Sequence, residues 1–185
     1  AAVGQAAVVV HRDGSDRASA VLHITVQGVN DPPVITGTSD QYAITDKDHV
    51  NPFAGVTITE VDAFGDQPLT IEIMIDNPEK GILDTRNTGF IQTAPGTYTF
   101  AGCTAASATA ALHNLVFWPA ENRITVPTTE VARFTLKVDD GYVAAPVTDT
   151  VTAVAVTAVN DPPIIQGTVA GLTVYYQLTI RPFAG

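Results

Sequence analysis

Few residues of this 185-residue chain combine the types and the spacing that catalysis requires. Asp139 and Asp140 form a carboxylate pair, which can run general acid–base chemistry where a pocket raises one of the two pKa values. The following Gly141 makes this sequence typical of a hairpin turn, and the tip of a hairpin is a poor pocket. The chain also lacks a Gly-x-Ser-x-Gly, a phosphate-binding loop and a His-Glu-x-x-His motif. We therefore expect no enzymatic activity.

Other reactive or ligand-binding side chains are isolated. Cys103 is the only cysteine and follows a predicted strand among small residues, which is typical of a core thiol rather than a nucleophile. Phe117 and Trp118 could stack on a sugar ring, but aromatic residues at a strand end more often pack in a core. The histidines have no metal-ligand spacing: His11, His23, His49 and His113.

The composition indicates an acidic, all-β protein. Thr, Val and Ile together make up 61 of the 185 residues, and β-branched side chains favour strands. The net charge of −10 argues against nucleic acid and anionic membrane surfaces as partners, because both repel an anionic protein. No apolar run approaches the roughly 20 residues that span a bilayer, so we expect no membrane insertion.

The chain repeats itself at an offset of about 130 residues. The sequence V-N-D-P-P stands at 29–33 and again at 159–163, and P-F-A-G stands at 52–55 and at 182–185. We therefore expect the C-terminal strands of a preceding repeat at 1–31, a complete repeat at 32–159 and the N-terminal part of a following repeat at 160–185. A repeat of this length is a whole domain, so the parent protein should be a string of domains. Asp46 and Asp48 flank Lys47 in a pattern that could hold a cation, but the second copy does not keep it, which favours a solvated loop.

Alternating apolar and polar residues predict strands through most of the complete repeat. The longest segments are 69–75, 131–138 and 147–159, and Asp139-Asp140-Gly141 between the last two reads as a hairpin turn. The alanine-rich segment 104–114 could form one short helix with Thr104 as its N-cap. The pattern predicts an antiparallel β-sandwich. Shorter strands are expected at 42–45, 56–60, 81–83, 98–101 and 115–118, with 6–11 and 19–27 in the preceding repeat.

Several segments together resemble the bacterial cadherin-like repeats of large, tandemly repeated secreted or surface-anchored proteins. They are the V-N-D-P-P linker, T-E-V-D-A-F-G-D at 59–66 and V-D-D-G at 138–141. The segment G-T-Y-T-F-A-G at 96–102, followed by alanines, is more similar to bacterial members than to animal cadherins. The resemblance covers about 30–160 and implies a Greek-key sandwich of the cadherin or immunoglobulin type, on the surface of a bacterial cell or secreted from it.

The resemblance also implies Ca²⁺ at the junctions between repeats, where linker and domain acids supply oxygen ligands. The first linker Asp of cadherins is replaced by Gly28 in one copy and Ala158 in the other, so fewer ions than in a full cadherin joint are expected. The alternative is that the linker is only a turn, in which Asn and Asp cap their own backbone. The implied ligands are Asn30, Asp31, Glu60, Asp62 and either Asp139 or Asp140.

Two classes of function follow. The first is a non-catalytic structural or adhesive module, whose partners are the adjacent repeats and a cell-surface protein or glycan. The second is a carbohydrate-binding or accessory domain of a secreted enzyme, with Trp118 or Tyr98 as the platform. Exposed aromatic residues in a row favour the second class, and buried aromatic residues with acids gathered at the domain ends favour the first. The strands of the incomplete repeats should pair with each other, with the central domain or with a neighbouring molecule.

Overall fold

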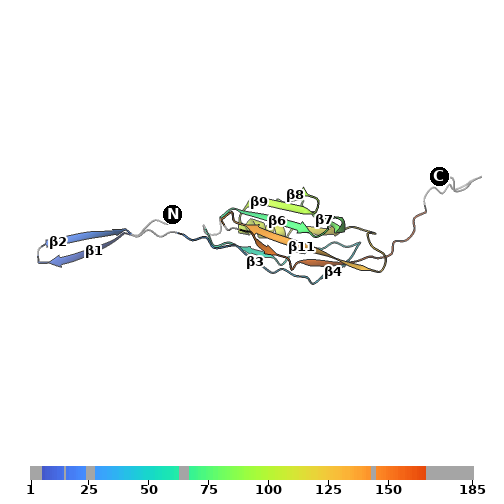
Figure 1. Ribbon diagram of the computed structural model, residues 1–185, viewed down its shortest axis with the longest axis horizontal. Helices are drawn as coiled ribbons and strands as arrows, with labels where there is room; N and C mark the ends of the chain where they lie inside the picture. The colour runs from blue at the N-terminus through green and yellow to red at the C-terminus, as the bar shows by residue number, and fades with distance from the viewer. Residues whose placement is uncertain (1–5, 15, 24–27, 63–66, 143–144, 166–185) are drawn as a thin grey trace, which may run out of the picture.

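The computed structural model describes residues 6–14, 16–23, 28–62, 67–142 and 145–165, and strands dominate it (Figure 1). The largest sheet has seven strands. All of its neighbouring pairs are antiparallel except the parallel pair β4–β13. The order along the sheet is β4 (Tyr42–Thr45), β13 (Ala153–Thr157), β11 (Thr129–Asp139), β6 (Leu69–Ile75), β9 (Thr97–Cys103) and β8 (Ile91–Ala94), with β12 (Val147–Asp149) also paired to β11.

Shorter elements supply the other side of the core. The strands β3 (Val34–Thr36) and β5 (Thr57–Thr59) form one antiparallel pair, and β7 (Gly81–Asp84) and β10 (Val116–Pro119) form another. The helix α1 (Ala105–Leu112) begins as predicted at Thr104, whose hydroxyl accepts a hydrogen bond from the Ser107 amide at 3.2 Å. A 3-10 turn, η2 (Pro78–Lys80), precedes β7.

The core is built from the inward-facing residues that alternation predicts. Along β6 every second residue from Leu69 to Ile75 is buried, and β11 buries Phe134 in the same way. The ring of Phe134 makes edge contacts with Phe53 and Phe117, at centroid distances of 5.5 and 5.2 Å. Burial of each large apolar side chain contributes about 1.5–3 kcal/mol, so these contacts hold the sheet against the shorter elements.

The segment predicted as one strand at 147–159 is broken into β12 and β13. The Asp149 carboxylate accepts a hydrogen bond from the Val151 amide at 2.9 Å, which turns the chain between the two strands. Both strands still pair with β11, β12 near its end at Val138 and β13 nearer its start at Thr129. The interruption therefore follows from an Asp side chain that competes for a backbone amide.

Two strands precede the first linker. β1 (Ala6–Asp13) and β2 (Asp16–His23) pair antiparallel with each other, and Gly14 takes a positive φ of 61° in the turn between them. This hairpin stands at the N-terminal side of the molecule in Figure 1. It is one of the pairings expected for an incomplete repeat, whereas the expectation for 166–185 lies outside the described residues. Within the described ranges, no helix has the length and apolar character needed to cross a membrane.

Candidate functional site

The first linker packs against the end of the domain through side chains distant in sequence. The Asn30 amide donates to Asp140 Oδ2 at 2.9 Å and accepts from Gln67 Nε2 at 3.2 Å. The Asn30 side chain thus joins the linker to the β11–β12 loop. The turn interpretation predicts only that Asn30 caps its own backbone, and it does not predict this long-range contact. We call this end the N-terminal junction and define it as Asn30, Asp31, Glu60, Asp62 and Asp140.

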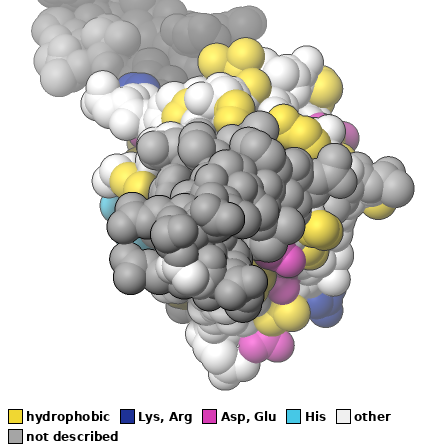
Figure 2. Space-filling model, turned by 90° about the vertical axis from the view of Figure 1, so that its left-hand side faces the viewer, with side chains coloured by type: hydrophobic (Ala, Val, Ile, Leu, Met, Phe, Trp, Pro, Cys, Tyr) yellow, Lys and Arg dark blue, Asp and Glu magenta, His cyan; other side chains and the backbone are white. Residues whose placement is uncertain are grey.

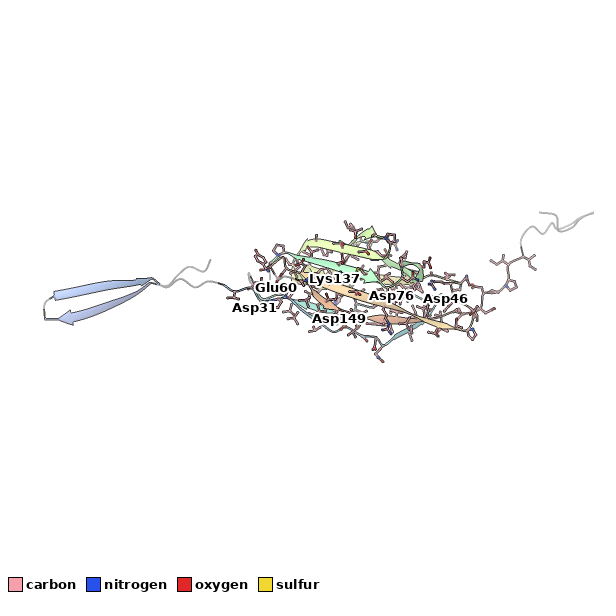
Figure 3. The ribbon with its side chains drawn as sticks, in the orientation of Figure 1. Asp31, Asp46, Glu60, Asp76, Lys137 and Asp149 are labelled. Carbon is pink, nitrogen blue, oxygen red and sulfur yellow. The ribbon has the colours of Figure 1, made fainter. Side chains whose placement is uncertain are left out.

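The acids after β5 hold the next residue of the linker. The Asp31 amide donates to Asp62 Oδ2 at 2.7 Å, and the Asp62 amide donates to Glu60 Oε1 at 2.8 Å. Asp31 and Glu60 therefore lie at the same end of the domain, as Figure 3 also shows. Figure 2 views the molecule from this side and shows acidic side chains among apolar ones.

Glu60 is the most unusual residue of the N-terminal junction. Its side chain is buried, with 7% of the residue exposed, and Oε2 has no hydrogen-bond partner among the described residues. A buried carboxylate oxygen without a donor is costly, because water no longer solvates it. Among the described residues, the ion pairs also leave out Asp31, Glu60 and Asp62. Within that part of the chain, this cluster of negative charge has no basic side chain as counterion.

The structure separates the two acids that the sequence left as alternatives. The Asp139 carboxylate accepts from the Gly141 amide at 2.8 Å and so closes its own turn. The Asp140 carboxylate accepts from the Tyr142 amide at 2.9 Å and also meets Asn30, and only 4% of Asp140 is exposed. Asp140 is therefore the residue that joins the N-terminal junction.

The implied calcium ligands carry the oxygen atoms that a hard cation binds, but their side chains do not converge on one point. The N-terminal junction offers carboxylate and amide oxygens, which Ca²⁺ prefers. In the part of the chain that the structure describes, however, no three Asp, Glu, His or Cys side chains converge as a set of metal ligands. Several of the oxygens instead accept hydrogen bonds from the linker and from neighbouring amides. Glu60 Oε2 is the oxygen that a cation would satisfy.

The second copy of the linker packs at the opposite end of the domain and uses a lysine. Lys47 Nζ lies 2.5 Å from Glu121 Oε2 and 2.8 Å from Asp161 Oδ1. Hydrogen bonds from Lys47, and next from Asn122, lower the pKa of the Asp161 carboxyl. The hydrogen bonds from Lys47 to Asp161 and Glu121 raise the pKa of Lys47. We call this end the C-terminal junction and define it as Lys47, Glu121 and Asp161 together with Asp46.

Asp46 completes the C-terminal junction, and sequence reasoning missed it. Only 4% of Asp46 is exposed, and its carboxylate accepts from the Val159 amide at 3.1 Å and from the Asn122 amide at 3.3 Å. The prediction of a solvated loop is therefore wrong for Asp46, although Lys47 and Asp48 beside it are exposed. No local pattern signals a partner that lies more than a hundred residues along the chain.

Of the candidate aromatic and thiol residues, some are buried in the core and Trp118 lies at the surface. Tyr98 and Phe117 are buried, so the prediction of Tyr98 as a sugar platform is wrong. Trp118 remains 40% exposed and stacks on His49 with a centroid distance of 4.3 Å. Cys103 is buried as predicted, and burial raises the pKa of its thiol.

Comparisons with family models, with curated proteins and with solved structures found no match for this chain.

Proposed function

We propose that the chain contains a non-catalytic, load-bearing module of a tandem array, secreted or displayed on a bacterial cell. In this proposal the central domain is a Greek-key β-sandwich of the cadherin or immunoglobulin type, and the V-N-D-P-P linkers join it to its neighbours. The observation that carries the proposal is the parallel pairing of β4, near the start of the domain, with β13, near its end.

This parallel pair resists tension on the two linkers. Pulling apart the ends of two parallel strands that lead to opposite linkers loads their hydrogen bonds together, in shear, instead of one after another. The pairing runs from Tyr42 opposite Val154 to Thr45 opposite Thr157. The Asp46 amide extends it by donating to the Thr157 carbonyl at 3.0 Å, and the Asp46 carboxylate then holds the Val159 amide. In Figure 1 the two linkers leave from opposite ends of the domain.

The two junctions use different groups of the linker Asp, so one linker could form both kinds of junction at the same time. At the N-terminal junction the linker Asp31 uses its main-chain amide, which Asp62 accepts. At the C-terminal junction the equivalent Asp161 uses its carboxylate, which Lys47 meets. One linker can therefore bind the preceding domain through its side chain and the following domain through its backbone. Together with the fixed φ of two consecutive prolines, these contacts restrict rotation between neighbouring domains.

We further propose that Ca²⁺ braces the N-terminal junction. The unpartnered Glu60 Oε2 and the absence of a basic counterion for Glu60 and Asp62 among the described residues support this assignment. Ca²⁺ takes six to eight oxygens and accepts carbonyls and water among them, so two or three carboxylates suffice as the charged ligands. Its charge would offset the repulsion between these acids.

Force spectroscopy on the full chain, held at its two ends, tests the load-bearing role. We expect the central domain to unfold in one cooperative rupture, and Asp46→Ala to lower the rupture force because the Val159 amide loses its acceptor. Asp48→Ala is the matched control, because among the described residues the Asp48 carboxylate bonds only to Thr45, three residues earlier at the end of β4, and to no segment distant in sequence. Gradual extension at low force, without a rupture, would contradict the proposal.

Thermal melting tests the calcium assignment separately. Millimolar Ca²⁺ should raise the melting temperature of the full chain by several degrees, because a ligand of the folded state stabilises it. Glu60→Gln should remove the rise, and Glu79→Gln should keep it, since Glu79 has a side chain that is 80% exposed. An unchanged melting temperature would exclude calcium and leave the load-bearing proposal standing.

A further inference from the structure

A surface pocket on the β7–β10 pair lies outside both junctions. It has a volume of about 360 Å³, at the lower end of the range of about 300–1,000 Å³ for small-molecule sites. In the pairing of the two strands Trp118 lies opposite Ile82, and both side chains are exposed. The pocket is lined by Ile82, Leu83, Asp84, Thr85, Arg86 and Trp118.

The apolar wall of this pocket is the indole of Trp118. Its ring stacks on His49 at an interplanar angle of 15°, so the imidazole supports the indole and fixes its orientation. Trp118 as a residue nevertheless remains 40% exposed. Keeping a large aromatic surface in water costs free energy, which is recovered when a ligand covers it.

The polar wall is the ion pair of Asp84 and Arg86. Arg86 Nε lies 3.0 Å from both oxygens of Asp84, and Arg86 Nη2 lies 2.6 Å from Asp84 Oδ2. The Arg86 amide donates to Asp84 as well, at 3.0 Å. Hydrogen bonds from Arg86 lower the pKa of Asp84 to about 2, so its carboxylate is an acceptor at every physiological pH. The Arg86 side chain is 83% exposed, and its guanidinium carries further N–H groups beyond those bonded to Asp84.

We propose that this pocket binds a neutral saccharide, with one pyranose ring stacked on Trp118 and its hydroxyls bonded to Asp84 and Arg86. The C–H face of a pyranose carries partial positive charge and fits the negative face of the indole. Its hydroxyls both donate and accept, which matches a carboxylate acceptor beside guanidinium donors. Asp84 already neutralises Arg86, and the chain carries a net charge of −10, so an anionic polysaccharide is disfavoured.

The chain contains a built-in reporter for this test, because Trp118 is its only tryptophan. The full chain is titrated with malto-, cello-, xylo-, manno- and laminaripentaose while the tryptophan emission is recorded. We expect a saturable blue shift with at least one of these sugars. Absence of a shift with all five would overturn the proposal.

Variants then locate the binding site. Affinity electrophoresis in gels that contain the matching polysaccharide should show that Trp118→Ala loses retention and that Asp84→Asn weakens it about tenfold. Tyr142→Ala is the matched control, because Tyr142 is an aromatic residue that is 74% exposed and does not line the pocket. Circular dichroism verifies that each variant is folded. Retention that survives in Trp118→Ala, or is lost equally in Tyr142→Ala, would refute the site.

Discussion

Replacement of Asp46 by alanine is the sharpest test of how the central domain is closed. The Asp46 carboxylate accepts two backbone hydrogen bonds from segments that follow it by 76 and 113 residues, Asn122 and Val159. Alanine removes both acceptors and leaves the backbone of β4 in place. The variant therefore isolates the contribution of one carboxylate to the joint between the start and the end of the domain.

The expected loss follows from the exposure of the two donors. The Val159 amide is partly buried and loses its acceptor, whereas Asn122 is exposed and water can replace the carboxylate there. An unsatisfied buried donor costs about 1–3 kcal/mol, so we expect a loss of about 2 kcal/mol in the free energy of unfolding. With a slope of about 2 kcal/mol per molar urea, the midpoint should fall by about 1 M. Trp118 emission is the readout.

Two further variants make the result interpretable. Among the described residues, Asp48→Ala removes hydrogen bonds only to Thr45, three residues earlier at the end of β4, so it should cost less than Asp46→Ala. Asp46→Asn keeps one acceptor oxygen but directs an amide N–H toward the second donor, and its stability should lie between the other two. If Asp46→Ala remains within about 0.5 kcal/mol of the parent chain, the assigned role of this carboxylate is wrong.

Three other predictions concern the buried side chains of Tyr98 and Cys103 and the ion pair of Asp84 with Arg86. Tyr98→Phe should lower the free energy of unfolding by about 1–3 kcal/mol, because the buried Leu83 amide donates to the Tyr98 hydroxyl at 3.0 Å; urea unfolding with an unchanged stability would contradict this. Cys103 should react with Ellman's reagent at pH 8 only as fast as the domain opens, because burial raises the pKa of its thiol; complete labelling within seconds in native buffer would show an accessible thiol. Asp84 should titrate near pH 2 by NMR, because Arg86 holds its pKa below the usual value of about 3.9. Its stabilising contribution is then present above about pH 4 and lost as the pH falls through about 2, and Arg86→Gln should return the titration toward the usual value.

Several elements could be predicted because their signals in the sequence are local. Alternation over 69–75 predicted β6 with its buried face, and Thr104 with the alanines after it predicted the start of α1. Both signals act between residues that are a few positions apart, so they survive in any tertiary context that buries one face. The resemblance to cadherin-like repeats likewise implied a cluster of Asn30, Asp31, Asp62 and either Asp139 or Asp140, and the structure brings Asn30, Asp31, Asp62 and Asp140 to one end.

Which distant groups meet became visible only in the folded domain. The tertiary structure made β4 and β13 parallel, chose Asp140 over Asp139 for the N-terminal junction, buried Asp46, and left Trp118 at the surface while its neighbour Phe117 entered the core. Each of these outcomes depends on partners separated by tens to more than a hundred residues, and such pairs form only when the sheet closes around a shared core. Adjacent residues of a strand point to opposite faces of the sheet. The register in which the strands pair therefore sets which of the two side chains is buried, and no local pattern encodes that register.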